Sequence, residues 1–332
     1  MQIKKTIEKV PGGMMIIPLF LGAIINTLFP ATATTLGSFT GALLTGALPI
    51  LAVFYFCVGT QISFVGSPVV VKKGVTFLVV KIGTAALVGL IAVNIMPSEY
   101  ITGGFFAGLS VLAIVAAMNE TNVGLYMALM SQYGTEEEVG AGSIMMLESG
   151  PFLTMVTFGV AGIASFPWEF LVGTILPLVI GVTIGSLDKE MKAFFKPAVP
   201  ILIPFFAFAL GAGMNIVNAV RAGLLGILLG LMVIIITGFT LFLADKYILK
   251  GSGIAGLAAA SSAGAVVTVP VAVAAANSKY EIMAADATAL CAASVIITAI
   301  LTPIIVAWYH KRLEKKKLAE NPQLAVSELT IK

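Results

Sequence analysis

Apolar stretches long enough to cross a lipid bilayer recur along the whole chain, and they constrain its fold more than any other feature. Of the 332 residues, 59% are hydrophobic and only 11% are charged, whereas a soluble domain carries about 25% charged residues. Because backbone groups in lipid need partners within their own segment, this composition predicts an all-α integral membrane protein. We expect ten transmembrane helices, at residues 13–29, 43–63, 75–95, 102–130, 139–163, 168–187, 198–217, 222–244, 253–276 and 283–307.

Basic residues lie mostly in the connections on one side of the predicted membrane. Ten crossings place both termini on the same side, and that side holds sixteen lysines and arginines, including Lys73 and the tail "HKRLEKKK". The opposite side holds only Arg221 and Lys279. This positive-inside bias predicts cytoplasmic termini, and it explains the net charge of +3 without nucleic-acid binding. Because Cys57 and Cys291 fall within apolar stretches, no disulfide framework is predicted.

Two early segments of the chain recur in its second half. The stretch "IIPLFLGAIINTLFP" (16–30) shares six of fifteen positions with "ILPLVIGVTIGSLDK" (175–189), and "ALPIL" (47–51) matches "AVPIL" (198–202). Chance similarity among glycine- and proline-rich apolar helices is the alternative, but both matches keep their order and nearly their spacing.

The repeat predicts two halves of five helices each, residues 1–165 and 166–310. Five is odd, so the second half enters the membrane from the opposite side, which gives the inverted repeat of many secondary transporters. Residues 311–332 are predicted to be a disordered, basic cytoplasmic tail.

The fourth and ninth stretches occupy corresponding places and both contain polar residues at bilayer depth. The fourth holds Asn119, Glu120, Thr121 and Asn122, and the ninth holds Ser261, Ser262 and Thr268. We expect both helices to break, near 118–122 and 262–269, and to cross there. New helix starts at mid-membrane would favour an anion, although the serines are equally consistent with close helix packing.

Ionisable residues within membrane helices are functional candidates by default. Glu120 and Glu148 are candidates for cation coupling, and Lys81 is interpreted as a snorkelling side chain or a partner for Glu148. Asp286 is interpreted as an interfacial charge. The secondary candidates Gln61 and Asn215 follow the repeated glycines, and either substrate or backbone would satisfy them.

Three stretches resemble the bacterial 2-keto-3-deoxygluconate permease family, which is grouped with the bile acid, arsenite and riboflavin transporters. They are "KKTIEKVPGGMMIIPLFLGAIINTLFP", "GLSVLAIVAAMNETNVGLYMAL" and "LESGPFLTM". The resemblance implies a bacterial inner-membrane protein with a core domain, containing the crossed helices four and nine, beside a flatter panel. It also implies proton-coupled uptake of a ketodeoxy sugar acid. Beyond the NETN motif it assigns no binding residues.

These features lead to the hypothesis of a symporter for an anionic sugar acid. Asn119, Thr121 and Asn122 would bind the carboxylate, and Ser261, Ser262 and Thr268 the hydroxyls. Glu120 would repel that anion in a low-dielectric site unless a proton or sodium ion neutralised it. The alternative is a sodium-coupled carrier of another organic anion. An enzyme is disfavoured because no H-E-x-x-H motif is present, and no cofactor is predicted. The sequence leaves homodimer formation open.

Overall fold

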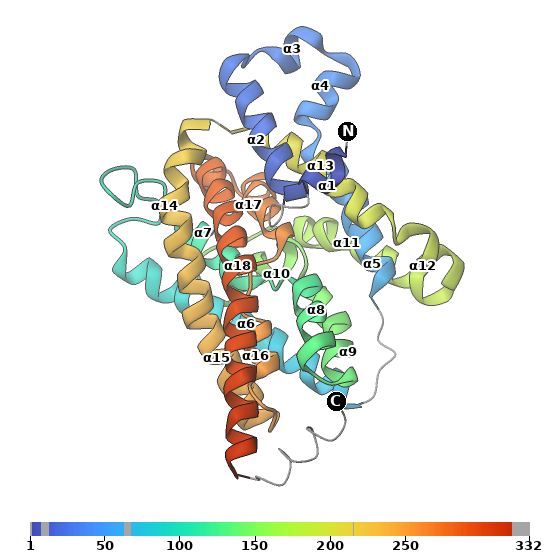
Figure 1. Cartoon of the computed structure of the whole chain (residues 1–332). Coiled ribbons are helices and arrows are strands. Elements are labelled where there is room, and N and C mark those ends of the chain that lie inside the picture. The colour runs from blue at the N-terminus through green and yellow to red at the C-terminus, as the bar shows by residue number, and fades with distance from the viewer. Residues whose placement is uncertain (1, 8–12, 63–67, 215, 321–332) are drawn as a thin grey trace.

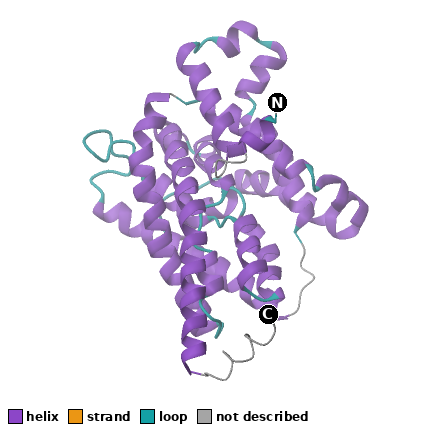
Figure 2. Cartoon of the chain, viewed as in Figure 1, coloured by secondary structure: helices purple, strands orange, loops and turns teal. Residues whose placement is uncertain are grey.

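The computed structural model describes residues 2–7, 13–62, 68–214 and 216–320, and within these ranges the chain is helical (Figure 2). No strand occurs in the described ranges, where Tyr100 and Ser110 form an isolated bridge. Six described helices are long and apolar enough to cross a membrane, or eight if each of two bent helix pairs counts as one span. The protein is therefore an all-helical, multi-pass membrane protein, and each of the ten predicted stretches contains helix.

One set of helices, here called the four-helix group, packs through two close pairs. It consists of α2 (Gly13–Leu28), α5 (Ala47–Gln61), α11 (Trp168–Leu187) and α13 (Ala198–Gly211). Helix α5 packs against α11 and α13, and α2 packs against α13. The shorter helices α1 (Ile3–Ile7), α3 (Thr32–Leu36), α4 (Ser38–Thr45) and α12 (Lys189–Phe195) flank this group, with α4 bent by 67° from α5 (Figure 1).

The remaining helices form a second set, here called the large group. Its members are α6 (Pro68–Ile95), α7 (Val111–Asn119), α8 (Val123–Tyr133), α9 (Glu136–Met145), α10 (Pro151–Val160), α14 (Ile216–Met232), α15 (Gly238–Leu243), α16 (Ile254–Ala258), α17 (Val269–Ala276) and α18 (Glu281–Glu320). Helix α6 packs on α7 and α9, while α14 and α18 run side by side (Figure 1). Wider π-helical turns at Val233–Thr237 and Ala244–Ile248 continue α14 and α15.

Glycines allow the two close pairs of the four-helix group to form. In the α2–α13 pair, a Cβ on Gly22 would collide with the Phe208 carbonyl, and a Cβ on Gly211 would collide with the Leu19 carbonyl. Backbones that approach this closely gain packing contacts that lipid-facing helices otherwise lack.

The α5–α11 pair has the same kind of contact. A Cβ on Gly59 would collide with the Leu178 carbonyl, and a Cβ on Gly181 would collide with the Phe56 carbonyl. Both pairs therefore depend on glycine at the point where their helices touch.

Two predicted boundaries differ most from the structure. Residues 102–110 are not part of the fourth helix, because Gly104 and Gly108 adopt positive φ and the Ser110 hydroxyl caps α7 at the Ala113 N–H. The basic tail was predicted to be disordered from residue 311, but α18 continues to Glu320. Its sequence there, "KRLEKKKLAE", consists of strong helix formers. Residues 321–332 lie outside the described ranges.

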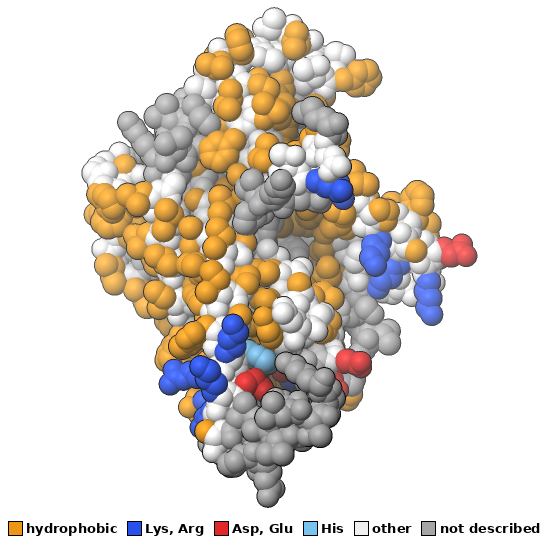
Figure 3. All heavy atoms as spheres, viewed as in Figure 1, with side chains coloured by type: hydrophobic (Ala, Val, Ile, Leu, Met, Phe, Trp, Pro, Cys, Tyr) orange, Lys and Arg blue, Asp and Glu red, His pale blue; other side chains and the backbone are white. Residues whose placement is uncertain are grey.

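Apolar side chains cover the flank of the molecule, while Lys and Arg gather at the end of α18 and around α12 (Figure 3). Large hydrophobic residues are exposed along the length of α6 and α11, including Val79, Leu87, Val172 and Leu176. Such a continuous apolar surface is expected where the solvent is lipid.

Alanine at Gly181 should destabilise the protein, because the new Cβ cannot fit against the α5 backbone. Overpacking of this kind costs about 1–3 kcal/mol, which should lower the melting temperature of detergent-purified protein. Gly173 on the same helix is the matched control, since its Cβ would meet nothing within 4 Å. Equal melting temperatures for Gly181→Ala and Gly173→Ala would contradict the close pairing.

Candidate functional site

The predicted break in the fourth stretch is confirmed. Helix α7 ends at Asn119, the chain is extended at Glu120, and α8 begins at Val123. The Asn122 side chain caps α8 by accepting a hydrogen bond from the Leu125 N–H at 3.1 Å. Four adjacent polar residues thus mark a point where helical hydrogen bonding stops within an apolar segment.

The ninth stretch also breaks, but the break starts earlier than predicted. Helix α16 ends at Ala258, a 3-10 turn spans Gly264–Thr268, and α17 follows with Pro270 in its first turn. The predicted start at residue 262 missed the first part of the break, because nothing in the run "LAAASS" distinguishes the alanines that are helical from those that are not.

The two breaks contact each other directly. The Ala263 N–H donates to the Glu120 carbonyl at 3.1 Å, and the Ser262 hydroxyl donates to the Ala117 carbonyl at 2.7 Å. The Asn122 N–H donates to the Ser261 hydroxyl at 3.3 Å. These bonds satisfy groups that lost their helical partners, as burial in lipid requires.

A third break, in the fifth stretch, was not predicted. The helical segments Glu136–Glu148 and Pro151–Val160 are bent by 73° relative to each other. Gly150 adopts φ 105° between them, a region open to glycine, and Pro151 starts the new helix. The signal was present in the sequence, because a Gly-Pro pair is a strong helix breaker.

Glu120 and Glu148 each reach across to the other residue's break. Oε1 of Glu120 accepts a hydrogen bond from the Gly150 N–H at 3.2 Å, and Oε1 of Glu148 accepts one from the Thr121 N–H. Both side chains are fully buried, and the second oxygen of each has no hydrogen-bond partner within the described ranges. The chain's own carboxylates therefore occupy the starts of α8 and α10. Of these two, the start of α8 is a place where the sequence suggested an anionic ligand.

Lys81 is buried and does not snorkel, and it lies near Glu148 without forming a direct ion pair with it. Its side chain is buried in α6, and Nζ donates to Oγ1 of Thr121 at 3.0 Å and to the carbonyls of Ala259 and Ser261 at 3.1 and 2.6 Å. Among the described residues, ion pairs join Lys73 to Glu138 and Lys279 to Glu99, and none joins Lys81 to Glu148. Thr121 links them instead, through its hydroxyl and its N–H.

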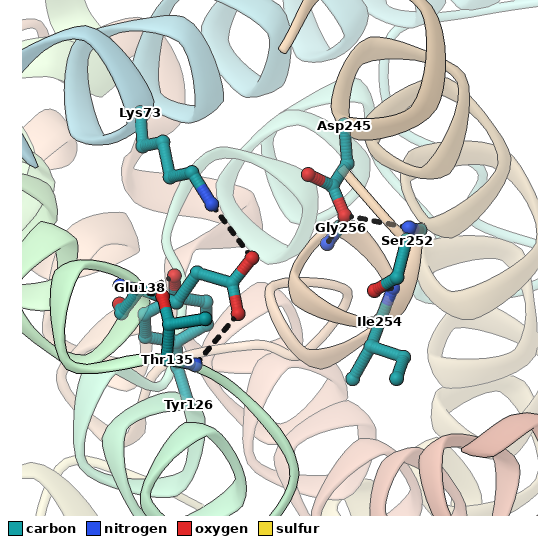
Figure 4. Close-up of polar contacts among 9 residues, drawn as sticks. Lys73, Tyr126, Thr135, Glu138, Asp245, Ser252, Ile254 and Gly256 are labelled. Carbon is teal, nitrogen blue, oxygen red and sulfur yellow. Dashed lines mark hydrogen bonds and ion pairs between the residues drawn. The ribbon is translucent and has the colours of Figure 1, made fainter. Parts of the chain in front are cut away.

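The far end of α16 is held by Asp245, a buried residue that the sequence analysis did not single out. Its Oδ2 accepts hydrogen bonds from the N–H groups of Gly253 and Gly256, at 2.9 and 3.4 Å (Figure 4). A carboxylate is favourable at a helix start. Helix α16 thus has an acidic partner at its start and the Lys81 ammonium just beyond its end.

A second acidic residue fixes the hairpin of α8 and α9 at the same end of the large group. Glu138 pairs with Lys73 at 2.6 Å and completes a capping box with Thr135 (Figure 4). The Tyr126 hydroxyl donates to the Glu138 carbonyl at 2.8 Å. The two half-helices α8 and α16 are therefore anchored at their outer ends as well as at the breaks.

Asn119 and Thr268 face different neighbours from the other residues of the breaks. The Asn119 amide donates to Thr154 at 3.1 Å and accepts from Thr157 at 2.9 Å, so it is directed at α10. The Thr268 hydroxyl bonds the Tyr55 hydroxyl at 2.7 Å. Tyr55 also packs against Gly150, and sequence reasoning missed it because an aromatic residue in an apolar run gives no distinguishing signal.

Gln61 and Asp286 lie away from the breaks. Gln61 donates to Thr60 and to the Lys192 carbonyl, at 2.7 and 2.9 Å, so its partners are a neighbouring residue and the backbone of α12. Asp286 accepts a hydrogen bond from the Tyr100 hydroxyl at 2.7 Å, and burial together with this carboxylate raises the pKa of Tyr100 to about 12. Asn215 lies outside the described residues.

A cavity of about 480 Å³ separates the breaks from the four-helix group. Thr121, Asn122, Ser149, Gly264 and Ala265 line one side, while Met15, Phe54, Val58 and Phe206 line the other. Within the described ranges, the N–H groups of Gly264 and Ala265 make no hydrogen bond. The cavity thus combines apolar walls with a few convergent polar groups, which is the usual character of a small-molecule site.

A second cavity, of about 460 Å³, lies elsewhere on the same boundary. Tyr55, Pro151, Glu169 and Thr268 are among its lining residues. Of the predicted substrate-binding residues, Thr121 and Asn122 therefore line the first cavity and Thr268 lines the second. Ser261 and Ser262 instead hold the breaks together.

Broken helices beside a cavity, in a chain of membrane-spanning helices, are typical of membrane transporters. The family model for 2-keto-3-deoxygluconate permease matches residues 4–315, and the chain belongs to this family. Permeases are transporters and not enzymes.

Curated relatives with the same description cover almost the whole chain. The 2-keto-3-deoxygluconate permease of Bacillus subtilis (strain 168) is 54% identical over 322 residues, which is 97% of this chain and 98% of the relative. That of Enterobacter sp. (strain 638) is 53% identical over 312 residues, 94% of each chain. That of Escherichia coli (strain K12 / DH10B) is 50% identical over 316 residues, 95% of this chain and 97% of the relative.

Proposed function

We propose that the protein imports 2-keto-3-deoxygluconate, an anionic sugar acid, by proton-coupled symport. The proposal depends on one observation: two buried carboxyl groups, Glu120 and Glu148, belong to breaks that line the first cavity. A negatively charged substrate in that cavity would be repelled by them unless a proton were bound. The name of the relatives supports the substrate. Sodium-coupled symport of another organic anion is the alternative.

The first cavity offers donors for the substrate carboxylate. The unpaired N–H groups of Gly264 and Ala265 open the helical segment that leads into α17, and such N–H groups favour an anion. The side chains of Thr121, Asn122 and Ser149 supply hydroxyl and amide groups for the sugar hydroxyls. The apolar wall of the four-helix group would exclude water.

Protonation of Glu120 would couple the proton to the substrate. A neutral carboxyl removes the repulsion, and burial of a neutral group costs less than burial of a charged one. Substrate affinity should therefore be highest at low pH and should fall as pH rises and the carboxyl ionises. Glu148 is the second candidate for the same role.

The ten-helix inverted repeat belongs to the same proposal. The eight candidate spans of the described helices become ten when α2 and the broken α16–α17 segment are also counted as spans. The glycine contacts support it: Gly22 and Gly211 join α2 to α13, and their counterparts Gly181 and Gly59 join α11 to α5. Exchanging the halves, 1–165 and 166–310, maps one pair onto the other, as a two-fold axis requires.

In this proposal the four-helix group is the panel and the large group is the core. Transport would proceed by rocking of the panel against the core. The two cavities on their shared boundary support this division. The distribution of basic residues, sixteen on one side against two on the other, supports cytoplasmic termini and a location in the inner membrane of a bacterial cell.

Uptake into proteoliposomes under separate ion gradients tests the proposal. Labelled 2-keto-3-deoxygluconate should accumulate when an inward proton gradient is imposed in sodium-free buffer. An inward sodium gradient at equal pH should give no accumulation. Accumulation that requires sodium would support the alternative, and a lack of any uptake would argue against the substrate.

Glu120→Gln tests the proton carrier. Glutamine keeps an acceptor for the Gly150 N–H but stays neutral, so the variant should bind the sugar acid without pH dependence. It should exchange substrate across the membrane and fail to accumulate it. Glu190→Gln, on the exposed helix α12, is the control and should transport normally. A Glu120→Gln protein that still concentrates substrate would transfer the role to Glu148.

Asn122→Asp tests the cavity. Aspartate is as good a helix cap as asparagine, so the melting temperature should change little. Its charge would repel the substrate carboxylate, and the KM for uptake should rise at least about tenfold for a loss of roughly 1.4 kcal/mol. Asn122→Ser keeps a cap without the charge and should raise KM less. Equal KM values for the two variants would exclude a charge effect at this position.

A further inference from the structure

Lys81 provides the positive charge at the point where the two broken helices meet. All three hydrogens of its ammonium group have an oxygen partner: one hydroxyl and two carbonyls. Of the described residues, it is the one buried lysine or arginine, with no exposed side-chain surface. A buried ammonium is expensive and requires such a set of partners.

We infer that the Lys81 ammonium occupies a monovalent-cation site formed by the breaks, so that the chain itself supplies the cation and no sodium ion binds there. This inference deepens the proposed function, because it removes sodium from the helix crossing and leaves the proton as the coupling ion.

The oxygen ligands support a cation site of this kind. The carbonyls of Ala259 and Ser261 lie beyond the end of α16, where helical hydrogen bonding has stopped. The third oxygen is the hydroxyl of Thr121. Unwound carbonyls near a half-helix end are the ligands that membrane transporters present to sodium. Without the ammonium, this site would hold three oxygens and no positive charge.

The surrounding charges also call for a cation. The end of α16 carries the negative end of a helix dipole. Glu148 is one hydrogen bond further away, because Thr121 contacts both side chains. Glu120 directly precedes Thr121 in the same extended segment and is also buried. A single positive charge beside these groups stabilises the crossing, and α6 holds it in place.

The test compares two substitutions in the purified full-length protein. Lys81→Ala removes the ammonium and leaves space for an ion, whereas Lys81→Met removes the ammonium but fills the space with an apolar chain. Melting temperatures are measured in sodium chloride and in choline chloride at equal ionic strength. Choline is too large to enter the site.

The wild type should melt at the same temperature in both salts, because its site is filled. Lys81→Ala should melt at least about 5 °C lower in choline, as expected for buried acceptors left without a donor. Sodium should restore a substantial part of that loss. Lys81→Met should be destabilised in both salts and should not respond to sodium.

Several outcomes would overturn the inference. They are a sodium-specific stabilisation of the wild type, a Lys81→Ala protein as stable in choline as the wild type, and an equal response to sodium in both variants. Lys81→Ala protein that cannot be recovered folded even in sodium would also contradict it. Proton-driven uptake by the wild type tests the proposed function separately, so the two failures are distinguishable.

Discussion

The arrangement of this protein depends on the backbone groups that are freed wherever a helix breaks inside the membrane. Each such group costs several kcal/mol in lipid if it has no partner. Three breaks meet in one region, and side chains of the breaks and of α6 satisfy several of the freed groups. Glu120 accepts a hydrogen bond at the break before α10, and Glu148 accepts one at the break before α8. Lys81 donates to carbonyls at the break in the ninth stretch. The polar residues of these apolar helices therefore have a structural role before any ligand arrives.

This double role gives a physical route to ion coupling. A carboxylate that holds a helix start is both a brace and a charge, so a change in its protonation alters the local hydrogen bonding and the field in the cavity together. Thr121 is the link, because its N–H contacts Glu148, its hydroxyl contacts Lys81, and it lines the first cavity. In the proposed cycle, a proton at this crossing would thus affect both substrate affinity and the geometry of the breaks.

Hydropathy and polar residues predicted the helical class and the first break, but not the contacts that form the site. The stretch 168–187 has the same bounds in the structure, since its ends are marked by Pro167 and Asp188. Residues 102–110 were misread because hydropathy counts their Phe and Leu and overlooks the glycines. The sequence could not show that Glu120 and Glu148 each accept a hydrogen bond from the other residue's break, because this depends on how α8 and α10 lie in space. The break at Gly150 was available from the Gly-Pro pair and was overlooked.

The contrast between the two kinds of helix contact bears on the proposed motion. Within the four-helix group, glycine contacts such as that of Gly181 bring backbones together, and a close-packed interior of this kind resists deformation. The boundary with the large group instead contains two cavities and a hydrogen bond between Tyr55 and Thr268. A hydrogen bond between neutral hydroxyls contributes only about 0.5–1.5 kcal/mol, so it can be exchanged for others at little cost. Relative movement along that boundary would leave the glycine contacts within the four-helix group intact. Since Thr268 follows the break in the ninth stretch, such movement would reach the contact between the breaks, where Lys81 and the two carboxyl groups lie.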